Sequence, residues 1–354
     1  MSRPTRVTLA LGGGGARGYA HIGVIQVLQE RGYEIVGVSG TSMGALIGGL
    51  HAAGQLPAYT DWVSSLTQRD VLRLLDPSLR SPGMIRGERV MAKVSDLLDG
   101  AQIEDLRIPF TAVATDLLAR KEVWFQHGPA DAAIRASIAL PSFITPVMLN
   151  GRLLADGGMM NPVPMAPLSA LQADLAVAVS LAGPAPEGPG RAPVHETAES
   201  RPLAEWSERL RRSAAGVLDN DAGRRVTTWL ANRRAEADQA GSAESPEGVA
   251  EAPTRLSPFE ELPADLRMLE VMELSMDALQ SVVTRYRMAS YPPDVLISVP
   301  KVACRTLDFH RGAEMIALGR QVAEETLDYS SSGTIRIEPD GHSATQSPQP
   351  LQKS

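Results

Sequence analysis

A serine between two glycines is the first residue of this sequence that could do chemistry. Ser42 lies in the run Gly-Thr-Ser-Met-Gly, after a predicted strand at 35–38 and before a predicted apolar helix at 45–53. A G-x-S-x-G run in that position is typical of a nucleophile elbow, which presents the seryl oxygen at the edge of a sheet. Gly40 and Gly44 permit the strained turn, and the positive end of the helix points at the seryl oxygen. The alternative is a serine that only caps the helix.

A run of four glycines is the second feature. Glycines 12–15 and Gly18 lie between a predicted strand at 6–11 and a predicted helix at 20–30, and they contain G-x-G-x-x-G. A dinucleotide fold also needs a carboxylate at the end of its second strand, but the sequence there is Gly-Val-Ser-Gly. What remains is a loop whose backbone N–H groups converge on a negatively charged oxygen beside a helix N-terminus.

A nucleophilic serine needs a base, and Asp156 is the best candidate. It ends a short apolar run at 153–155 and precedes Gly157 and Gly158, so its backbone can turn tightly and approach another loop. Where water is excluded, desolvation raises the basicity of a carboxylate toward the operating pH. The alternative is that Asp-Gly-Gly is an ordinary turn.

Histidine is the other candidate base, and a Ser-His-Asp triad stays open. Hydrogen-bonded packing is expected for His21 and His51, which lie in apolar helical stretches. His195 and His342 lie in Gly/Pro-rich or polar segments. His127 and His310 have no Asp or Glu motif to orient them.

The elements that must position these residues follow a strand–helix–strand–helix order from residue 6 to residue 54. This order predicts a parallel sheet with both glycine-rich turns at its carboxyl edge, where α/β proteins bind ligands. Further helices are predicted at 59–75, 88–98, 130–139, 263–288 and 309–327, and further strands at 110–114, 122–125, 175–181 and 295–299.

Composition limits the function classes. The 354 residues include 34 basic and 41 acidic ones, a net charge of −7, which argues against a nucleic-acid binder. The single cysteine, Cys304, excludes an internal disulfide or a cysteine zinc cluster, and its neighbours predict a small core residue. There is no signal peptide and no run of about 18 apolar residues, so a cytoplasmic location is expected.

The chain is predicted to have an insertion and a tail. Glycine and proline are concentrated after residue 182, and the stretch 184–262 is predicted to be a flexible, partly helical insertion. The tail 330–354 is polar and is expected to be disordered. The catalytic domain is then 5–183, completed by a helix, a strand and a helix at 263–329.

Together the three glycine-containing motifs resemble one family, the patatin-like phospholipases, and specifically their bacterial members. The loop Gly-Gly-Gly-Ala-Arg-Gly at 13–18, the serine elbow at 40–44 and the aspartate motif at 156–158 match in order and spacing. Two departures are Gly12, where plant patatins carry an acidic residue, and Ser142, where a glycine is usual.

The resemblance implies a three-layer α/β/α fold with a mainly parallel central sheet. It implies a Ser42–Asp156 dyad without histidine, an oxyanion hole at Gly13, Gly14 and Gly15, and no metal or other cofactor. The expected substrate is a lipid or phospholipid ester, with transient membrane contact and no nucleic-acid partner. The alternatives are a non-catalytic lipid-binding or regulatory module of the same fold, and a lipid acyltransferase. The oligomeric state stays open.

Three further roles stay open. Arg17 either neutralises a phospholipid phosphate or braces the glycine loop by bonding to backbone carbonyls. Asp116 is expected to be a turn residue rather than a second base. The methionines at 268, 272 and 276 have helical spacing, which predicts core residues, with a soft acyl-binding or dimer surface as the alternative.

Overall fold

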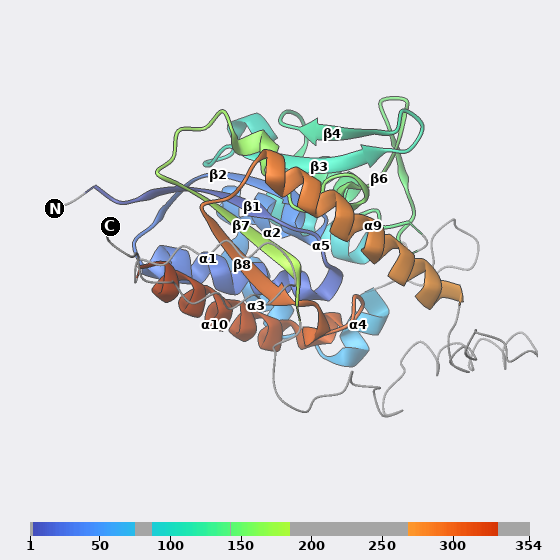
Figure 1. Cartoon of the computed structure of the whole chain (residues 1–354). Coiled ribbons are helices and arrows are strands. Elements are labelled where there is room, and N and C mark those ends of the chain that lie inside the picture. Colours follow the sequence, from blue (N-terminus) through green and yellow to red (C-terminus); the bar gives the residue numbers. More distant parts are fainter. Residues whose placement is uncertain (1–2, 75–86, 142, 185–267, 332–354) are drawn as a thin grey trace, which may run out of the picture. The chain divides into compact units, whose positions relative to one another are not determined.

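The computed structural model describes residues 3–74, 87–141, 143–184 and 268–331. The predicted insertion beyond Pro184, the first residues of the helix predicted from 263, and the tail beyond Ser331 lie outside these ranges. The described residues form an α/β fold around one eight-stranded sheet of order β5-β6-β3-β2-β1-β7-β8, with β4 paired to β3 (Figure 1). The predicted fold class, with helices around a central, mainly parallel sheet, is confirmed.

The strands and helices have the following bounds. The strands are β1 (Arg6–Leu11), β2 (Glu34–Thr41), β3 (Phe110–Asp116), β4 (Lys121–Phe125), β5 (Val147–Leu149), β6 (Arg152–Asp156), β7 (Leu175–Gly183) and β8 (Val295–Pro300). The helices are α1 (Ala20–Glu30), α2 (Met43–Ala52), α3 (Leu56–Ser64), α4 (Gln68–Leu74), α5 (Glu88–Leu98), α6 (Ala130–Ser137), α9 (Met268–Ser290) and α10 (Gly312–Ser331). Short 3₁₀ helices include η1 (Gly15–Tyr19), η3 (Gly157–Met159) and η5 (Lys301–Ala303).

Five neighbouring strands, from β3 through β2, β1 and β7 to β8, run parallel. Strands β4 and β6 pair antiparallel with β3, and β5 pairs antiparallel with β6. Both glycine-rich turns therefore leave the same carboxyl edge, because β1 and β2 are parallel neighbours. β8 pairs with β7, so the chain after residue 268 extends the sheet that carries the motifs.

The sheet is covered unequally on its two faces. Val7, Leu9 and Leu11 of β1 enter the main core, which includes residues of α1, α2 and α10. Ala10 points to the other face, where a smaller cluster contains Val163, Met165, Leu168 and Ala178. Helix α9 crosses that second face, opposite α10 (Figure 1), and its Met288 packs against the smaller cluster.

Two local predictions were wrong. The helix predicted at 59–75 is two helices, α3 and α4. Ser65 Oγ donates to the carbonyl of Trp62, and both the backbone N–H and the hydroxyl of Thr67 donate to Asp70, so side-chain caps interrupt the helical period. Helix α10 also continues to Ser331, two residues into the predicted tail.

Strand β5 was not predicted. It pairs with β6 through a turn at Asn150 and Gly151, which have φ values of 49° and 74°. Asn-Gly is a strong hairpin signal because both residues tolerate positive φ.

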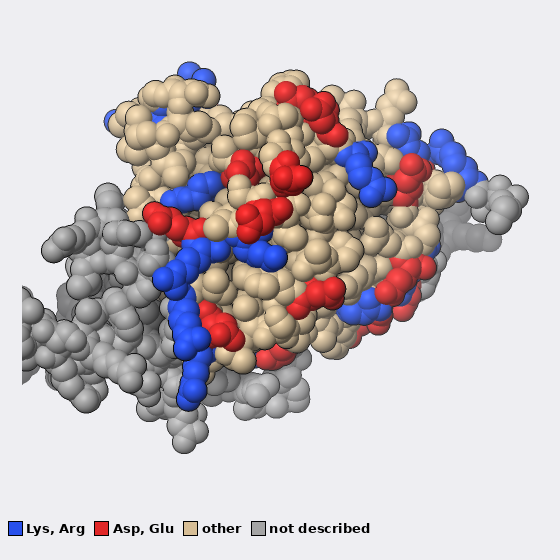
Figure 2. Space-filling model, turned by 180° about the vertical axis from the view of Figure 1, so that it is seen from behind, with Lys and Arg blue, Asp and Glu red and all other residues tan. Residues whose placement is uncertain are grey.

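The surface carries charges of both signs. Figure 2 shows acidic and basic side chains interspersed among uncharged ones on the face that it presents. Among the described residues, no helix is long and apolar enough to cross a membrane.

Candidate active site

The serine elbow is the most strained turn of the site. Ser42 has φ 56° and ψ −124°, a conformation that non-glycine residues rarely adopt, and it is 8% exposed. A Cβ on Gly40 would lie 2.3 Å from the carbonyl oxygen of Gly44, and a Cβ on Gly44 would lie 2.0 Å from the carbonyl oxygen of Leu11. Both glycines are therefore required by close backbone contact. The Ser42 side chain makes no cap to α2, so the capping alternative loses its support.

Asp156 is brought to Ser42 by the end of β6. It lies opposite Ala114 of β3, its backbone N–H donates to Ala139, and its carbonyl accepts from Thr115 Oγ1 at 2.9 Å. The Ser42 hydroxyl lies close enough to this carboxylate to lower its pKa, and the Gly158 N–H donates to Oδ1 at 2.7 Å.

Burial dominates the acidity of this carboxylate. Asp156 is 2% exposed, and desolvation raises its pKa to about 6, although the hydrogen bonds from Ser42 and Gly158 act in the opposite direction. The carboxylate is thus ionised near pH 7 and is more basic than an exposed aspartate. A group of this kind can accept a proton from a hydroxyl within hydrogen-bond reach.

The glycine loop lies against Ser42. A Cβ on Gly13 would lie 3.3 Å from Cβ of Ser42. The Gly13 N–H donates to the carbonyl of Pro162 at 3.0 Å, so this amide is already engaged. Within the part of the chain that the structure describes, the amides of Gly14 and Gly15 donate to no backbone carbonyl.

One buried histidine holds the start of this loop. His21 is fully buried in α1, and its Nε2 lies 2.8 Å from the carbonyl oxygen of Gly12. Since a carbonyl only accepts, Nε2 must carry the proton. Burial lowers the pKa of His21 to about 4, so the ring is neutral near pH 7. Its expected packing role is confirmed, since its hydrogen bond goes to Gly12, whereas the group that interacts with Ser42 is the carboxylate of Asp156.

Ser137 and Asn161 belong to the site although sequence reasoning gave them no role. Ser137 is fully buried, accepts the Ser42 N–H at 2.9 Å and donates to the Val113 carbonyl. The carbonyl of Asn161 accepts from Thr41 Oγ1 at 2.8 Å. Both residues lie far from the elbow in the sequence, so the motif around Ser42 does not contain them.

Arg17 braces the loop. Its guanidinium donates to the carbonyls of Lys301 and Cys304 at 3.3 and 2.9 Å, and the residue is 8% exposed. Gly18 and Gly157 are equally confined. A Cβ on Gly18 would lie 2.3 Å from Cβ of Met43, and a Cβ on Gly157 would lie 2.2 Å from the carbonyl oxygen of Val113.

The remaining candidates have structural roles or lie at the surface. Asp116 Oδ1 accepts the N–H groups of the two turn residues 118 and 119, as expected. Cys304 is buried, and burial raises the pKa of its thiol to about 11, which suits a core residue. The core prediction for Met272 was wrong, because it is 48% exposed. Helical spacing defines a face, but it does not say whether anything covers that face.

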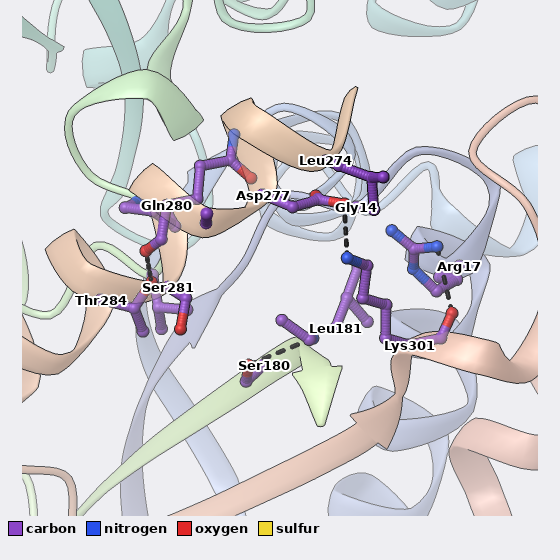
Figure 3. Close-up of a pocket in the computed structure, with 15 residues that line it drawn as sticks. Gly14, Arg17, Ser180, Leu181, Leu274, Asp277, Gln280, Ser281, Thr284 and Lys301 are labelled. Atoms are coloured by element: carbon purple, nitrogen blue, oxygen red, sulfur yellow. Dashed lines mark hydrogen bonds and ion pairs between the residues drawn. The ribbon is translucent and has the colours of Figure 1, made fainter. Parts of the chain in front are cut away.

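A pocket of about 330 Å³ lies between the glycine loop and α9 (Figure 3). Gly13, Gly14 and Leu181 contribute to its lining, and Asp277 of α9 is ion-paired with Lys301 of η5. Gln280 of α9 reaches the aspartate motif, since its Nε2 lies 3.1 Å from where a Cβ on Gly158 would be. No cluster of three or more metal-binding side chains occurs among the described residues.

Comparisons relate this chain to known proteins. The family model described as patatin-like phospholipase matches residues 9–169. An uncharacterized NTE family protein of Mycobacterium tuberculosis is 49% identical over 340 residues, which cover 92% of each chain. Patatin-like phospholipase domain-containing protein 6 of Homo sapiens is 36% identical over 166 residues, 45% of this chain and 12% of that protein. Among solved structures, VipD from Legionella pneumophila matches with a TM-score of 0.47 and 15% identity, covering 93% of this chain and 67% of that one.

Proposed function

Because the chain belongs to the patatin-like phospholipase family, we propose that it is a lipid acyl hydrolase that cleaves carboxylic esters through a Ser42–Asp156 dyad. The single observation that carries this proposal is the strained Ser42 beside the buried carboxylate of Asp156, whose pKa its hydroxyl lowers. The proposed reaction uses a serine, a carboxylate and backbone amides, and it calls for no metal or other cofactor.

In the first half-reaction, Ser42 Oγ attacks the ester carbonyl while Asp156 accepts its proton. The tetrahedral intermediate collapses, the bond to the alcohol breaks, and Asp156 returns the proton to the leaving oxygen. In the second half-reaction, Asp156 takes a proton from water, which attacks the acyl-serine ester. The fatty acid leaves and Ser42 regains a proton.

The oxyanion of both intermediates lies at the glycine loop in this proposal. The amides of Gly14 and Gly15 are its donors, since the Gly13 amide donates to Pro162. The Gly13–Pro162 bond instead fixes the loop. Loss of one oxyanion donor typically raises the barrier by about 3–4 kcal/mol.

The test is fluorophosphonate labelling and aryl-ester hydrolysis by wild type, Ser42→Ala and Asp156→Asn. Both variants are expected to lose kcat by at least about a thousandfold, and Ser42→Ala is expected not to label. Asp116→Asn is the matched control, because Asp116 is also a buried aspartate but only closes a turn. A wild-type protein that neither labels nor turns over, or full activity of Asp156→Asn, would refute the dyad.

The same assay separates the two alternative functions. A non-catalytic lipid-binding or regulatory module would bind lipid without Ser42-dependent turnover. An acyltransferase would pass the acyl group to an added alcohol, such as glycerol, in preference to water. We favour hydrolysis, because it needs no second substrate beside the acyl-serine.

The proposed substrates are lipid or phospholipid esters, reached by transient contact with a lipid surface. Support comes from α9, which carries large apolar side chains that are at least 41% exposed at Val271, Met272, Leu274, Leu279, Val282 and Tyr286. Since the net charge is −7, general attraction to anionic lipid is not expected, and apolar contact has to provide the affinity.

A further inference from the structure

The pocket beside the glycine loop has a mixed lining, in which charged and hydrogen-bonding side chains lie beside apolar ones such as Val163, Leu181 and Leu274 (Figure 3). Lys301 and Asp277 both line it, and their ion pair joins η5 to α9 (Figure 3). Arg17 also contributes to the lining. Further hydrogen-bonding side chains come from β7 and α9, namely Ser180, Gln280, Ser281 and Thr284.

The ion pair disfavours a hydrocarbon chain in the part of the pocket that Lys301 and Asp277 line. The side chains of Lys301 and Asp277 are 41% and 28% exposed, so water reaches both charges. An acyl chain packed against them would remove that water without replacing its hydrogen bonds, which is costly for charged groups. A group that can itself form hydrogen bonds and carry charge fits the pocket better.

The pocket also adjoins the reacting centre. Gly13 and Gly14 line it, and the position of a Cβ on Gly13 is only 3.3 Å from Cβ of Ser42. A group bound there is therefore only a few bonds from an ester at Ser42 and can belong to the same molecule. In a lipid ester, the polar part is the alcohol side, which is the leaving group of the first half-reaction.

The charges around the pocket favour an anion. Two cations, Arg17 and Lys301, line it against one carboxylate, Asp277. The guanidinium of Arg17 donates to backbone carbonyls and pairs with no carboxylate among the described residues, and its buried Nε has no hydrogen-bond partner there. Lys301 is the cation that can move toward a ligand, because its ammonium is on a flexible stem and partly exposed.

Building on the proposed hydrolase function, we propose that this pocket is the subsite for the polar head of the lipid ester. Lys301 is its specificity-determining residue, and it binds an anionic oxygen group of that head, such as a phosphate. Asp277 acts against it, because it competes with the head for the same ammonium.

Substituting each partner of the ion pair separates a binding role from a structural role. If Lys301 binds the head group, the two substitutions change kcat/KM in opposite directions, whereas a pair that only holds α9 predicts a loss in both variants. Both Lys301→Gln and Asp277→Asn break the bond that joins η5 to α9, but the first removes the cation and the second frees it. The substrates are a lysophospholipid, a monoacylglycerol with the same acyl chain and an aryl ester. Lys121→Gln is the matched control, since Lys121 is an exposed lysine of β4 away from the pocket lining.

For the lysophospholipid, Lys301→Gln is expected to lower kcat/KM by about tenfold or more, and Asp277→Asn is expected to raise it severalfold. For the monoacylglycerol and the aryl ester, both variants are expected to stay within about twofold of wild type. Lys121→Gln is expected to match wild type on all three substrates.

Three results would overturn the subsite. The first is an equal loss on all three esters in both variants, which would mean that the ion pair only holds α9. The second is an unchanged ratio of lysophospholipid to monoacylglycerol turnover in Lys301→Gln. The third is Lys301-dependent inhibition of aryl-ester hydrolysis by inorganic phosphate together with that unchanged ratio, which would assign the pocket to free phosphate. The proposed function itself fails separately, and the subsite with it, if wild type hydrolyses none of the esters.

Discussion

At the scale of single residues, the burial of Asp156 determines the pH range in which the site can work. A carboxylate must be ionised before it can accept a proton, and burial raises the pKa of Asp156 to about 6. We therefore expect kcat/KM for a soluble aryl ester to rise with pH through about 6 and to level off above it. Initial rates between pH 4.5 and 8 test this. A profile that stays flat down to pH 4.5 would contradict it.

The same burial has a consequence for folding, which provides a control. The folded protein binds the Asp156 proton more tightly than the unfolded chain, so this residue's contribution to stability falls as the pH rises from about 4 to about 6. Asp156→Asn removes that dependence. At pH 8 the variant is expected to be inactive yet at least as resistant to urea as wild type, so that loss of activity is not confused with unfolding.

At the scale of elements, the contact between α1 and the glycine loop is the one that we expect to matter for the rate. The carbonyl of Gly12 and the N–H of Gly13 belong to one peptide plane, and they are held from opposite sides by His21 and Pro162. A fixed plane at this point directs the amides that follow it. Preorganised donors of this kind act on the transition state more than on the bound substrate.

His21→Leu is accordingly expected to lower kcat for an aryl ester by about tenfold or more while KM changes by less than about twofold. His21→Gln, which keeps a donor, is expected to recover part of the loss. The control is His51→Leu, because His51 is likewise buried, with its pKa lowered to about 4, but lies at the other end of α2 from the elbow. Steady-state kinetics on the three variants measure these changes in kcat and KM. An equal loss of kcat in His51→Leu would contradict a special role for His21.

The elements also explain what the sequence could predict. The elbow and the glycine loop were predictable because strand, glycines and helix are adjacent in the chain. The break between α3 and α4 depends on two side-chain caps, and the Ser42–Ser137 bond joins residues 95 positions apart. Such contacts arise from tertiary packing, which no window of a single sequence contains. Asn150-Gly151 is different, because this hairpin signal is local and is contained in the sequence itself.

At the scale of the whole molecule, α10 is packed against α1 with almost no space between the backbones. A Cβ on Gly319 would lie 2.0 Å from the carbonyl oxygen of Ala20, and a Cβ on Gly23 would lie 2.1 Å from that of Ile316. The last described helix is thus fitted to the helix that carries His21.

The exposed side of α9 shows the limit of sequence reasoning at this scale, because periodicity cannot say which helix face finds a partner.

Gly319→Ala is expected to destabilise the protein by about 1–3 kcal/mol, since the added carbon forces the two helices apart. Intrinsic helix propensity alone would favour alanine by about 1 kcal/mol, so a loss of stability points to the contact. Urea unfolding measures the change. The control is Ala317→Val, at an exposed position of the same helix, which is expected to change the free energy of unfolding by less. A Gly319→Ala protein that is more stable than wild type would show that the helices can separate freely.

The hydrogen bonds that brace the glycine loop have a consequence for biosynthesis. They run from Arg17 to the carbonyls of residues 301 and 304, and from the Ala16 N–H to the carbonyl of Thr306. The glycine loop leaves the ribosome before the carbonyls that brace it, which are added almost three hundred residues later. A nascent chain that already contains both Ser42 and Asp156 still lacks these braces. For the proposed hydrolase, we therefore expect activity to be acquired only after the chain has passed Thr306.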